Sequence, residues 1–353
     1  MLELRGVQKR WTDFALKGVS LHVREGEYFV LLGPSGAGKS LLLELVAGFH
    51  RPDAGRILLH QREVTSLPPE RRKVGFVYQD SMLFPHRSVA QNIAYGLRGD
   101  GTQTRRRVEE LARMLRIDGL LDRSPETLSG GEKQRAAIAR ALAVEPDVLL
   151  MDEPLSALDP PTQQALRGEL LRVHGETGVT VLHVTHDQAE AREMGERVGI
   201  LRDGRLVQVG TGDEVFQKPE NGFVAAFTGC DNILPGTARL RDGFTEVRCG
   251  DAEIVATDRR TGSVRAAIRP ENIIISREPV RTSARNQFRG RVASVTPRGR
   301  TFAVTGQFDG MELTALVTAQ SLEELSIAPG AEVYFSFKAS SMHLMPPEEA
   351  TDD

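Results

Sequence analysis

Residues 33–40 have the sequence Gly33-Pro34-Ser35-Gly36-Ala37-Gly38-Lys39-Ser40. They match the pattern G-x-x-x-x-G-K-S, in which a glycine-rich loop turns successive N–H groups inward around an anion. The apolar run Tyr28–Leu32 precedes the loop, and the helical run Ser40–Ala47 follows it. Strand, glycine loop and helix open a parallel α/β unit. The sequence therefore predicts a phosphate-binding loop at a helix N-terminus.

Two carboxylates follow a second apolar run. Val148–Met151 predicts a short buried strand, and Asp152 and Glu153 come directly after it. Parallel strands end at one edge of a sheet, so we expect Asp152 beside the glycine loop. Lys39 is then expected to reach the β- and γ-phosphates of a nucleotide, with the Ser40 hydroxyl and Asp152 holding Mg²⁺. Glu153 would orient the attacking water or accept its proton.

A second anion-binding helix N-terminus is predicted at Ser129-Gly130-Gly131-Glu132, ahead of the helical run Lys133–Ala143. One chain rarely needs two such sites for one nucleotide, unless the second serves a nucleotide held by another copy. A head-to-tail dimer with two ATP molecules between opposite loops meets this requirement. The alternative is an ordinary glycine-containing N-cap.

Composition excludes several classes of protein. The chain has 353 residues, 40% of them hydrophobic, and a formal charge of −3, which is ordinary for a globular protein and gives no electrostatic footprint for nucleic acid. Cys230 and Cys249 form no Cys-x-x-Cys pair, so neither a disulfide framework nor a zinc site is indicated. No apolar run approaches the roughly 18–20 residues of a membrane span, and the first residues are too charged for a signal peptide. We therefore expect a cytosolic, reduced protein, for which any role at a membrane must come through a partner.

The character of the chain changes after Gly229, where short β-type runs with Gly, Pro and Asp between them begin. Just before this change, Asp213–Thr228 predicts a closing helix. The predicted parts are an α/β domain at 1–230 with a helical subdomain at about 88–146, an all-β domain at 231–345 with two similar modules at 232–276 and 283–345, and a disordered tail at 346–353.

Six ordered motifs together resemble the ATP-binding-cassette (ABC) ATPases, over about residues 1–230. Besides the three motifs above, they are Gln79 in VYQDSMLFPH, Ser156–Asp159, and His186 in THDQAEA. The resemblance implies that Gln79 senses the γ-phosphate and Mg²⁺ and reports to a membrane partner. It also implies that Asp159 communicates across the dimer and that His186 contacts the γ-phosphate.

The resemblance further implies an aromatic side chain that stacks on adenine, ahead of the second strand. Trp11 fits this place best, and Phe14 is the alternative because the spacing to Trp11 is one residue short. The cofactors implied are ATP and Mg²⁺, with Mg²⁺ held by Ser40, Gln79 and Asp152.

Two features resemble importer ATPases in particular. These are Leu83-Phe84-Pro85-His86 after Gln79, and the β-rich extension. Such ATPases lie at the cytoplasmic face of the membrane and act with two permease subunits and a substrate-binding protein. Residues 283–341 resemble the molybdate-binding Mop-type module, an OB/TOBE-like β domain, of molybdate and tungstate importer ATPases. The fold expected is therefore a P-loop α/β domain followed by an all-β domain.

A tetrahedral dianion is well held by hydroxyls, backbone N–H groups, an amide and one or two cations. The second module offers Ser283, Arg285, Asn286, Thr318, Ser321, Lys338, Ala339 and Ser340. Oxyanion bound there would hold the ATPase dimer open and inhibit transport. The alternatives are a purely dimerising barrel, an importer for sulfate, ferric iron or sugar, and an oxyanion sensor whose ATPase is incidental.

Overall fold

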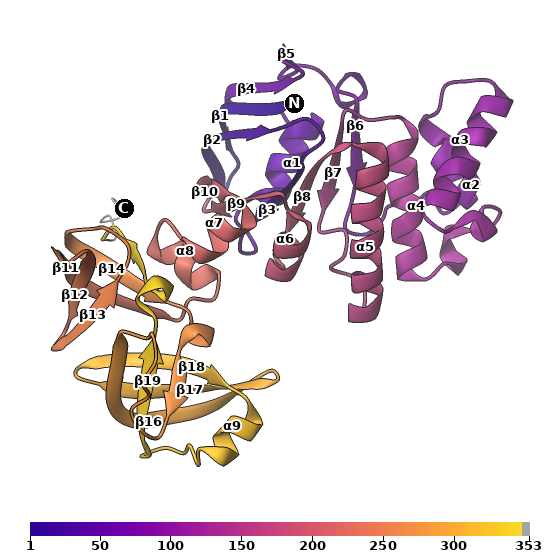
Figure 1. Cartoon of the computed structure of the whole chain (residues 1–353). Coiled ribbons are helices and arrows are strands. Elements are labelled where there is room, and N and C mark those ends of the chain that lie inside the picture. Colours follow the sequence, from indigo (N-terminus) through magenta and orange to yellow (C-terminus); the bar gives the residue numbers. More distant parts are fainter. Residues whose placement is uncertain (348–353) are drawn as a thin grey trace. The chain divides into compact units, whose positions relative to one another are not determined.

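The structure is a computed structural model that describes residues 1–347. The chain divides into two compact units, the first spanning Met1–Gly212 and the second beginning at Asp213 (Figure 1). Within residues 1–347 no helix has both the length and the apolar character needed to cross a bilayer. Of the predicted tail at 346–353, residues 348–353 lie outside the described part.

The first unit contains a six-stranded sheet of order β10-β9-β3-β8-β7-β6. The strands are β3 (Tyr28–Leu32), β6 (Val74–Val77), β7 (Val148–Asp152), β8 (Thr180–Thr185), β9 (Arg197–Arg202) and β10 (Arg205–Gly210). Strands β9, β3, β8, β7 and β6 are parallel, and β10 runs antiparallel at one edge. Every residue of β3 and β8 is buried, as expected for parallel strands covered on both faces. The strands predicted at 28–32 and 148–151 are confirmed.

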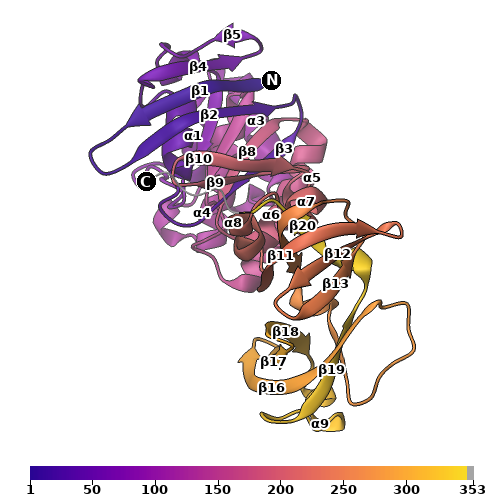
Figure 2. The ribbon, with the colours of Figure 1, turned by 90° about the vertical axis from the view of Figure 1, so that its left-hand side faces the viewer.

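An antiparallel sheet of order β2-β1-β4-β5 lies beside the first and can be followed in Figure 2. Its strands are β1 (Leu2–Arg10), β2 (Ala15–Val23), β4 (Ala54–Leu59) and β5 (Arg62–Glu63). Helix α1 (Lys39–Ala47) shares one apolar cluster with strands of both sheets, and its Leu42, Leu43 and Leu45 are fully buried. These buried leucines hold α1 behind the glycine loop, while Ser40 at its start stays exposed.

The helices of the predicted segment 88–146 gather on one side of the first unit (Figure 1). They are α2 (Val89–Ile93), α3 (Gly101–Met114) and α4 (Gly130–Ala143). The remaining long helix of the unit is α5 (Pro160–Thr177), and the short helix α6 (Gln188–Met194) follows β8. Ser88, Ser129 and Asp159 each cap the helix that follows, which is why these helices begin where they do.

The single closing helix predicted at Asp213–Thr228 is wrong. The structure has two short helices there, α7 (Gly212–Gln217) and α8 (Gly222–Phe227). Pro219 lies between them and has no N–H to continue a helix. The side chain of Asn221 then accepts a hydrogen bond from the Val224 N–H at 2.9 Å and starts α8 afresh.

The second unit also contains two five-stranded antiparallel sheets, of order β13-β12-β11-β14-β20 and β15-β19-β16-β17-β18. Their elements are β11 (Asn232–Arg241), β12 (Phe244–Cys249), β13 (Ala252–Ala256), β14 (Gly262–Ile268), β15 (Ile274–Ser276), β16 (Asn286–Arg298), β17 (Thr301–Phe308), β18 (Met311–Val317), α9 (Ala319–Glu324), β19 (Glu332–Phe337) and β20 (His343–Met345). The two sheets exchange their last strands: β15 pairs with β19, and β20 pairs with β14. One apolar cluster contains residues of both sheets.

Two buried asparagines reinforce this exchange. Asn232, at the start of β11, accepts a hydrogen bond from the Thr314 N–H at 2.6 Å and donates to the Thr314 carbonyl at 2.9 Å. Asn286, at the start of β16, does the same with Val255, at 2.7 and 2.9 Å. Each amide therefore pairs with an edge strand of the other sheet, β18 or β13, in the way a backbone would. The two sheets form one folded body.

Candidate functional site

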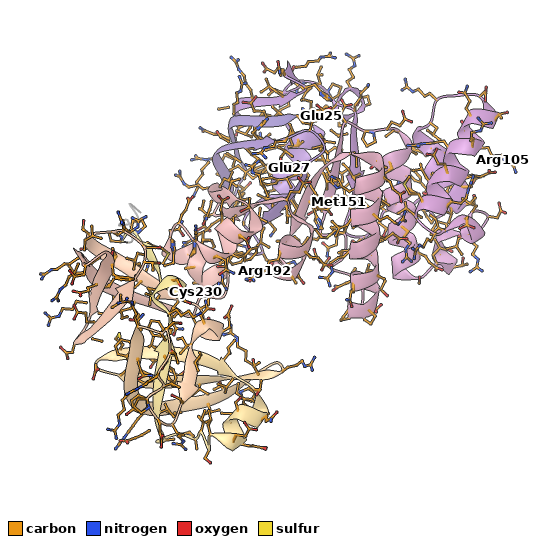
Figure 3. The ribbon with its side chains drawn as sticks, in the orientation of Figure 1. Glu25, Glu27, Arg105, Met151, Arg192 and Cys230 are labelled. Carbon is orange, nitrogen blue, oxygen red and sulfur yellow. The ribbon has the colours of Figure 1, made fainter. Side chains whose placement is uncertain are left out.

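Four of the predicted motifs meet at one edge of the six-stranded sheet. The glycine loop follows β3, Gln79 follows β6, Glu153 follows β7 and His186 follows β8. These four strands are parallel neighbours in the order β3-β8-β7-β6, so their carboxyl ends lie together. Met151, labelled in Figure 3, is fully buried at the end of β7 and anchors the carboxylate that follows it.

Lys39 lies inside the glycine loop and is only 5% exposed. Its ammonium donates hydrogen bonds to the carbonyls of Gly33 at 2.8 Å and Pro34 at 3.0 Å. Burial lowers the pKa of Lys39, and the nearby carboxylates of Glu153 and Asp152 oppose that shift. The ammonium is bonded to neutral carbonyls alone, so an anionic phosphate would be a stronger partner.

The loop leaves no room for side chains at two of its glycines. Gly38 has φ +97°, and a Cβ there would lie 2.4 Å from the ring of Phe14. A Cβ on Gly33 would lie 2.3 Å from the Leu201 carbonyl oxygen. Gly38 is also the N-cap of α1 and supplies no side-chain acceptor. The first N–H groups of α1 thus have no capping side chain, as an anion site at a helix N-terminus requires.

The Ser40 hydroxyl donates a hydrogen bond to the Asp152 carboxylate at 2.9 Å. Burial raises the pKa of Asp152, and the neighbouring carboxylates of Glu153 and Glu44 add to this, against the hydrogen bond from Ser40 and the charge of Lys39. A hydroxyl and a carboxylate side by side are oxygen ligands of the kind that Mg²⁺ binds together with nucleotide phosphates. A cation there would relieve the unfavourable burial of the Asp152 charge.

Glu153 is held in an unusual backbone conformation beside His186. Its φ is +44°, a region that non-glycine residues rarely occupy and that clusters at functional sites. Its N–H donates to the Val184 carbonyl at 2.9 Å, and the Ser156 hydroxyl donates to its carbonyl at 2.9 Å. The Glu153 carboxylate lies 3.0 Å from His186 Nδ1. This pair has the geometry of a base and its positioning partner.

The two aromatic candidates for adenine stacking differ in their surroundings. The ring of Phe14 packs against Gly38 of the loop, whereas the ring of Trp11 lies 6.4 Å from Phe14 and 6.0 Å from His50. The backbone N–H of Trp11 donates to the backbone carbonyl of Phe14 at 2.7 Å, which closes the turn between β1 and β2. Both rings are partly buried against the core of the first unit.

The Ser129-Gly130-Gly131 segment lies beside the N-terminus of α5. Unlike the four motifs above, it does not follow a strand of the six-stranded sheet. A Cβ on Gly131 would lie 2.7 Å from Thr162, and one on Gly130 would lie 3.1 Å from Leu158. Ser129 and Glu132 bond to each other's backbone N–H groups, which fixes the start of α4. Together with Asp159 these residues line a cleft of about 480 Å³.

Thr162 is a residue of this cleft that the sequence analysis missed. Its hydroxyl donates to the Asp159 carboxylate at 2.7 Å, and its N–H donates to the same side chain at 3.2 Å. These hydrogen bonds lower the pKa of Asp159. The spacing Asp-x-x-Thr at a helix start is the signal that would have found it.

The oxyanion candidates of the second unit lie near the two ends of strand β16. Asn286 pairs with Phe337, so Ser283, Arg285 and Asn286 lie at the same end as Lys338, Ala339 and Ser340. Thr318 follows β18 at the other end, where Val317 pairs with Phe302 and Phe302 with Pro297.

Several of these candidates already have partners. The amide of Asn286 is bonded to Val255, and the Thr318 and Ser321 hydroxyls lie 3.0 Å apart at the start of α9. The Arg285 guanidinium lies 4.1 Å from the centre of the Phe244 ring. Lys338 and Ser340 are exposed, and Ala339 is buried.

Comparison with protein families matches two models to the chain. The model described as ABC transporter matches residues 16–156, and the TOBE domain model matches residues 282–344. The chain is 47% identical over 349 residues to the molybdate/tungstate import ATP-binding protein WtpC of Pyrococcus horikoshii, which covers 98% of this chain and 100% of that protein. It is 41% identical over 304 residues to the sulfate/thiosulfate import ATP-binding protein CysA of Caulobacter vibrioides, covering 84% and 88%.

Solved structures match about three fifths of the chain. The cbiO1 protein of Clostridium perfringens, part of the ABC transporter complex cbiONQ, has 31% identity and a TM-score of 0.57, and the match covers 61% of this chain and 90% of that one. A dimeric structure of the ATP-binding cassette MJ0796 bound to ADP and Pi has 33% identity and a TM-score of 0.54, covering 60% and 99%.

Proposed function

The chain belongs to the ABC transporter family as the ATP-hydrolysing subunit of an importer with a TOBE domain, and from this premise we propose the roles of its site residues and the identity of its cargo. The observation that carries the site roles is the meeting of the Ser40–Asp152 and Glu153–His186 pairs with Lys39 at one sheet edge. An anion, a cation and an activated water can all be held there.

The loop at 33–40 and Lys39 bind the nucleotide phosphates, and Trp11 or Phe14 stacks on adenine. Ser40, Gln79 and Asp152 hold Mg²⁺, which when bound neutralises charge on the phosphates. Glu153 takes a proton from the attacking water while the water oxygen forms its new bond to the γ-phosphorus.

The bond between the γ-phosphorus and the β,γ-bridging oxygen breaks in the same reaction, and ADP and phosphate are the products. His186 holds Glu153 in place through the 3.0 Å contact and donates to the γ-phosphate. Gln79 is exposed at the end of β6, where it can respond to the bound nucleotide.

Two copies act head to tail, with Ser129, Gly130, Gly131 and Glu132 of each bound to the nucleotide of the other. The cleft at the start of α4 supports this arrangement, because its helix N-terminus attracts phosphate. Asp159 lies in the same cleft and would carry the signal between copies. The dimeric MJ0796 cassette is a relative that assembles in pairs.

An exposed aromatic surface next to Gln79 is suited to the integral-membrane permease. Met82 and Tyr95 are more than half exposed, and the rings of Phe84 and Tyr95 lie 4.5 Å apart. The Arg87 guanidinium lies 5.1 Å from the centre of the Tyr95 ring. Exposed apolar groups rimmed by charge mark protein contact sites. A permease dimer docked there would place the chain peripherally at the cytoplasmic face of the membrane and link it to a substrate-binding protein outside.

The cargo is molybdate or tungstate. Support comes from three relatives named for molybdate/tungstate import, at 45–47% identity, and from the exposed Lys338 and Ser340 beside the start of β16. The competing proposal is another cargo with a purely structural second unit, since a sulfate/thiosulfate relative is 41% identical.

Calorimetric titration of the full chain with molybdate, tungstate, sulfate and phosphate distinguishes these cargoes. We expect the first two to bind with a Kd near 1 μM, about −8 kcal/mol, and sulfate and phosphate to give no heat. Equal binding of sulfate would contradict the molybdate/tungstate proposal. No binding of any anion by a folded chain would make the second unit structural, so that the cargo would have to be identified through the permease and receptor. Both outcomes leave the ATPase assignment intact.

Bound oxyanion would also inhibit the ATPase, because a ligand that prefers the open dimer opposes ATP-driven closure. The test is ATP turnover of the chain assembled with its permease, with and without molybdate. Unchanged turnover at a molybdate concentration that saturates the chain would rule feedback out.

A further inference from the structure

A buried polar triad lies under the loop that carries His186. His183 in β8 is completely buried, and its Nδ1 lies 3.0 Å from the Tyr28 hydroxyl in β3. On the other side of the ring, Nε2 lies 3.5 Å from a carboxylate oxygen of Glu190 in α6, which is 3% exposed. In the described structure neither the His183 Nε2 nor that Glu190 oxygen makes a hydrogen bond, so the 3.5 Å contact is what links the two side chains.

The triad can arrange its protons in two ways. With a neutral ring, the Tyr28 hydroxyl donates to Nδ1 and Nε2–H donates to Glu190. With a charged ring, Nδ1–H donates to the Tyr28 oxygen, and the hydroxyl proton points to the Met194 sulfur at 3.9 Å. Burial alone would raise the pKa of Glu190, but its contact with His183 lowers that pKa, together with a hydrogen bond from the Thr185 side chain and the charge of Arg167.

The triad joins the three elements that surround His186. Tyr28 begins β3, the strand that leads to the phosphate loop, and His183 belongs to β8, which pairs with β3 (Figure 1). Glu190 lies in the first turn of α6. Each end of the His186 loop is thus fixed to the strand of the phosphate loop.

The loop itself is too short to move independently of these anchors. Only His186 and Asp187 separate the end of β8 from the start of α6. The Asp187 N–H donates to the Thr185 hydroxyl at 3.0 Å, and its carboxylate accepts from the N–H groups of Ala189 and Glu190. A shift of α6 would therefore be transmitted to His186.

We propose that Tyr28, His183 and Glu190 are positioning residues that hold His186 against Glu153 and toward the phosphate loop. Their loss should lower the rate of hydrolysis rather than the affinity for ATP, because the phosphate loop itself stays intact. This inference rests on the role proposed above for His186.

The experiment measures kcat and KM for Mg-ATP, and the thermal midpoint, on full-length variants. Glu190→Ala is expected to lower kcat about tenfold or more with KM within about twofold, while Glu190→Gln, which can still accept from Nε2–H, keeps most of the activity. The double variant His183→Phe/Glu190→Leu fills the same space without the hydrogen bonds. It is expected to recover the thermal midpoint but not kcat.

A matched control is His174→Gln. The rings of His174 and Tyr28 lie edge to face with their centroids 5.3 Å apart, and His174 Nε2 contacts the Gly26 carbonyl at 3.0 Å, but His174 belongs to α5. It is expected to change the thermal midpoint and leave kcat unchanged.

The inference is overturned if folded Glu190→Ala turns over at the wild-type rate, or if the apolar double variant recovers kcat together with stability. Should those chains fail to fold, Tyr28→Phe decides, because it removes only a hydroxyl: a lower kcat at constant KM supports the triad, and an unchanged kcat refutes it. His186→Ala separates the two proposals. If it leaves kcat intact, the role of His186 itself is wrong; if it abolishes turnover while the triad variants do not, only the triad inference fails.

Discussion

Two pairs of side chains at the sheet edge of the first unit differ from the buried polar side chains inside the second unit. At the sheet edge of the first unit, Ser40 bonds to Asp152 and Glu153 contacts His186, so side chains are partnered with one another. Inside the second unit, Asn232 and Arg269 bond to backbone groups. Side chains that bond to each other at an edge can exchange partners with a ligand. Those that satisfy buried backbone cannot leave without cost to the fold.

The largest effect is expected for Glu153→Gln. It keeps the size of the side chain but removes the proton acceptor, so ATP turnover should fall by about 10²–10⁴-fold. The thermal midpoint should stay close to that of the wild type, because the amide can still contact His186. Steady-state ATPase assays and thermal unfolding of the same preparation test both halves. A large loss of stability would show that Glu153 supports the fold, as the buried polar side chains of the second unit do.

Arg269→Met is the matching change in the second unit. Arg269 is 7% exposed and donates to the carbonyls of Phe216 and Thr228, near the ends of α7 and α8. Its loss leaves these acceptors buried without donors, and we expect about 3 kcal/mol less free energy of unfolding.

Lys338→Met provides the control for Arg269→Met. Both residues immediately precede a short 3-10 turn between two strands, but Lys338 is exposed. Its substitution should change the free energy of unfolding by less than about 0.5 kcal/mol, as measured by denaturant titration. A comparable loss in both variants would show that burial of Arg269 contributes little.

Asn232→Ala and Asn286→Ala should each lower the free energy of unfolding, by similar amounts of about 2 kcal/mol. Each change removes a pair of hydrogen bonds to buried backbone in the opposite sheet. Denaturant titration of the full chain, monitored by circular dichroism, gives both values. If Asn286→Ala were neutral for stability but abolished molybdate binding, Asn286 would belong with the ligand-binding side chains instead.

The smallest effect is expected for Asp152→Asn, and its sign is opposite. The pKa of Asp152 is raised in the folded chain, so its ionisation destabilises the fold as the pH rises from the unfolded-state pKa through the folded-state pKa. The asparagine variant should therefore have a slightly higher thermal midpoint than the wild type at pH 7 without nucleotide, and equal stability at a pH below both pKa values. Calorimetric scans at the two pH values test this. Lower stability at pH 7 would contradict the assignment of burial as the dominant cause.

The sequence predicts well that these motifs meet at one sheet edge, because each motif is short and follows its own strand. The glycine loop needs only eight consecutive residues, and the sheet order brings the rest together. Long-range pairs are different. Nothing near Tyr28 in the sequence indicates that its hydroxyl meets His183, since sheet order and helix placement create that contact.

The second unit shows a further limit. An amide such as Asn286 suits an anion and a backbone strand equally, so composition alone cannot separate the two uses. The exchanged strands β15 and β20 have three residues each, which is too short for a periodic pattern to reveal their pairing.

The strand exchange also sets an order for folding during synthesis. Strand β20 completes the sheet that begins with β11, so that sheet waits until about a hundred further residues have left the ribosome. The first unit contains all strands of its own sheets and can fold earlier. A nascent chain would therefore have a folded phosphate loop well before the β unit closes. Closure of that unit requires residues 343–345.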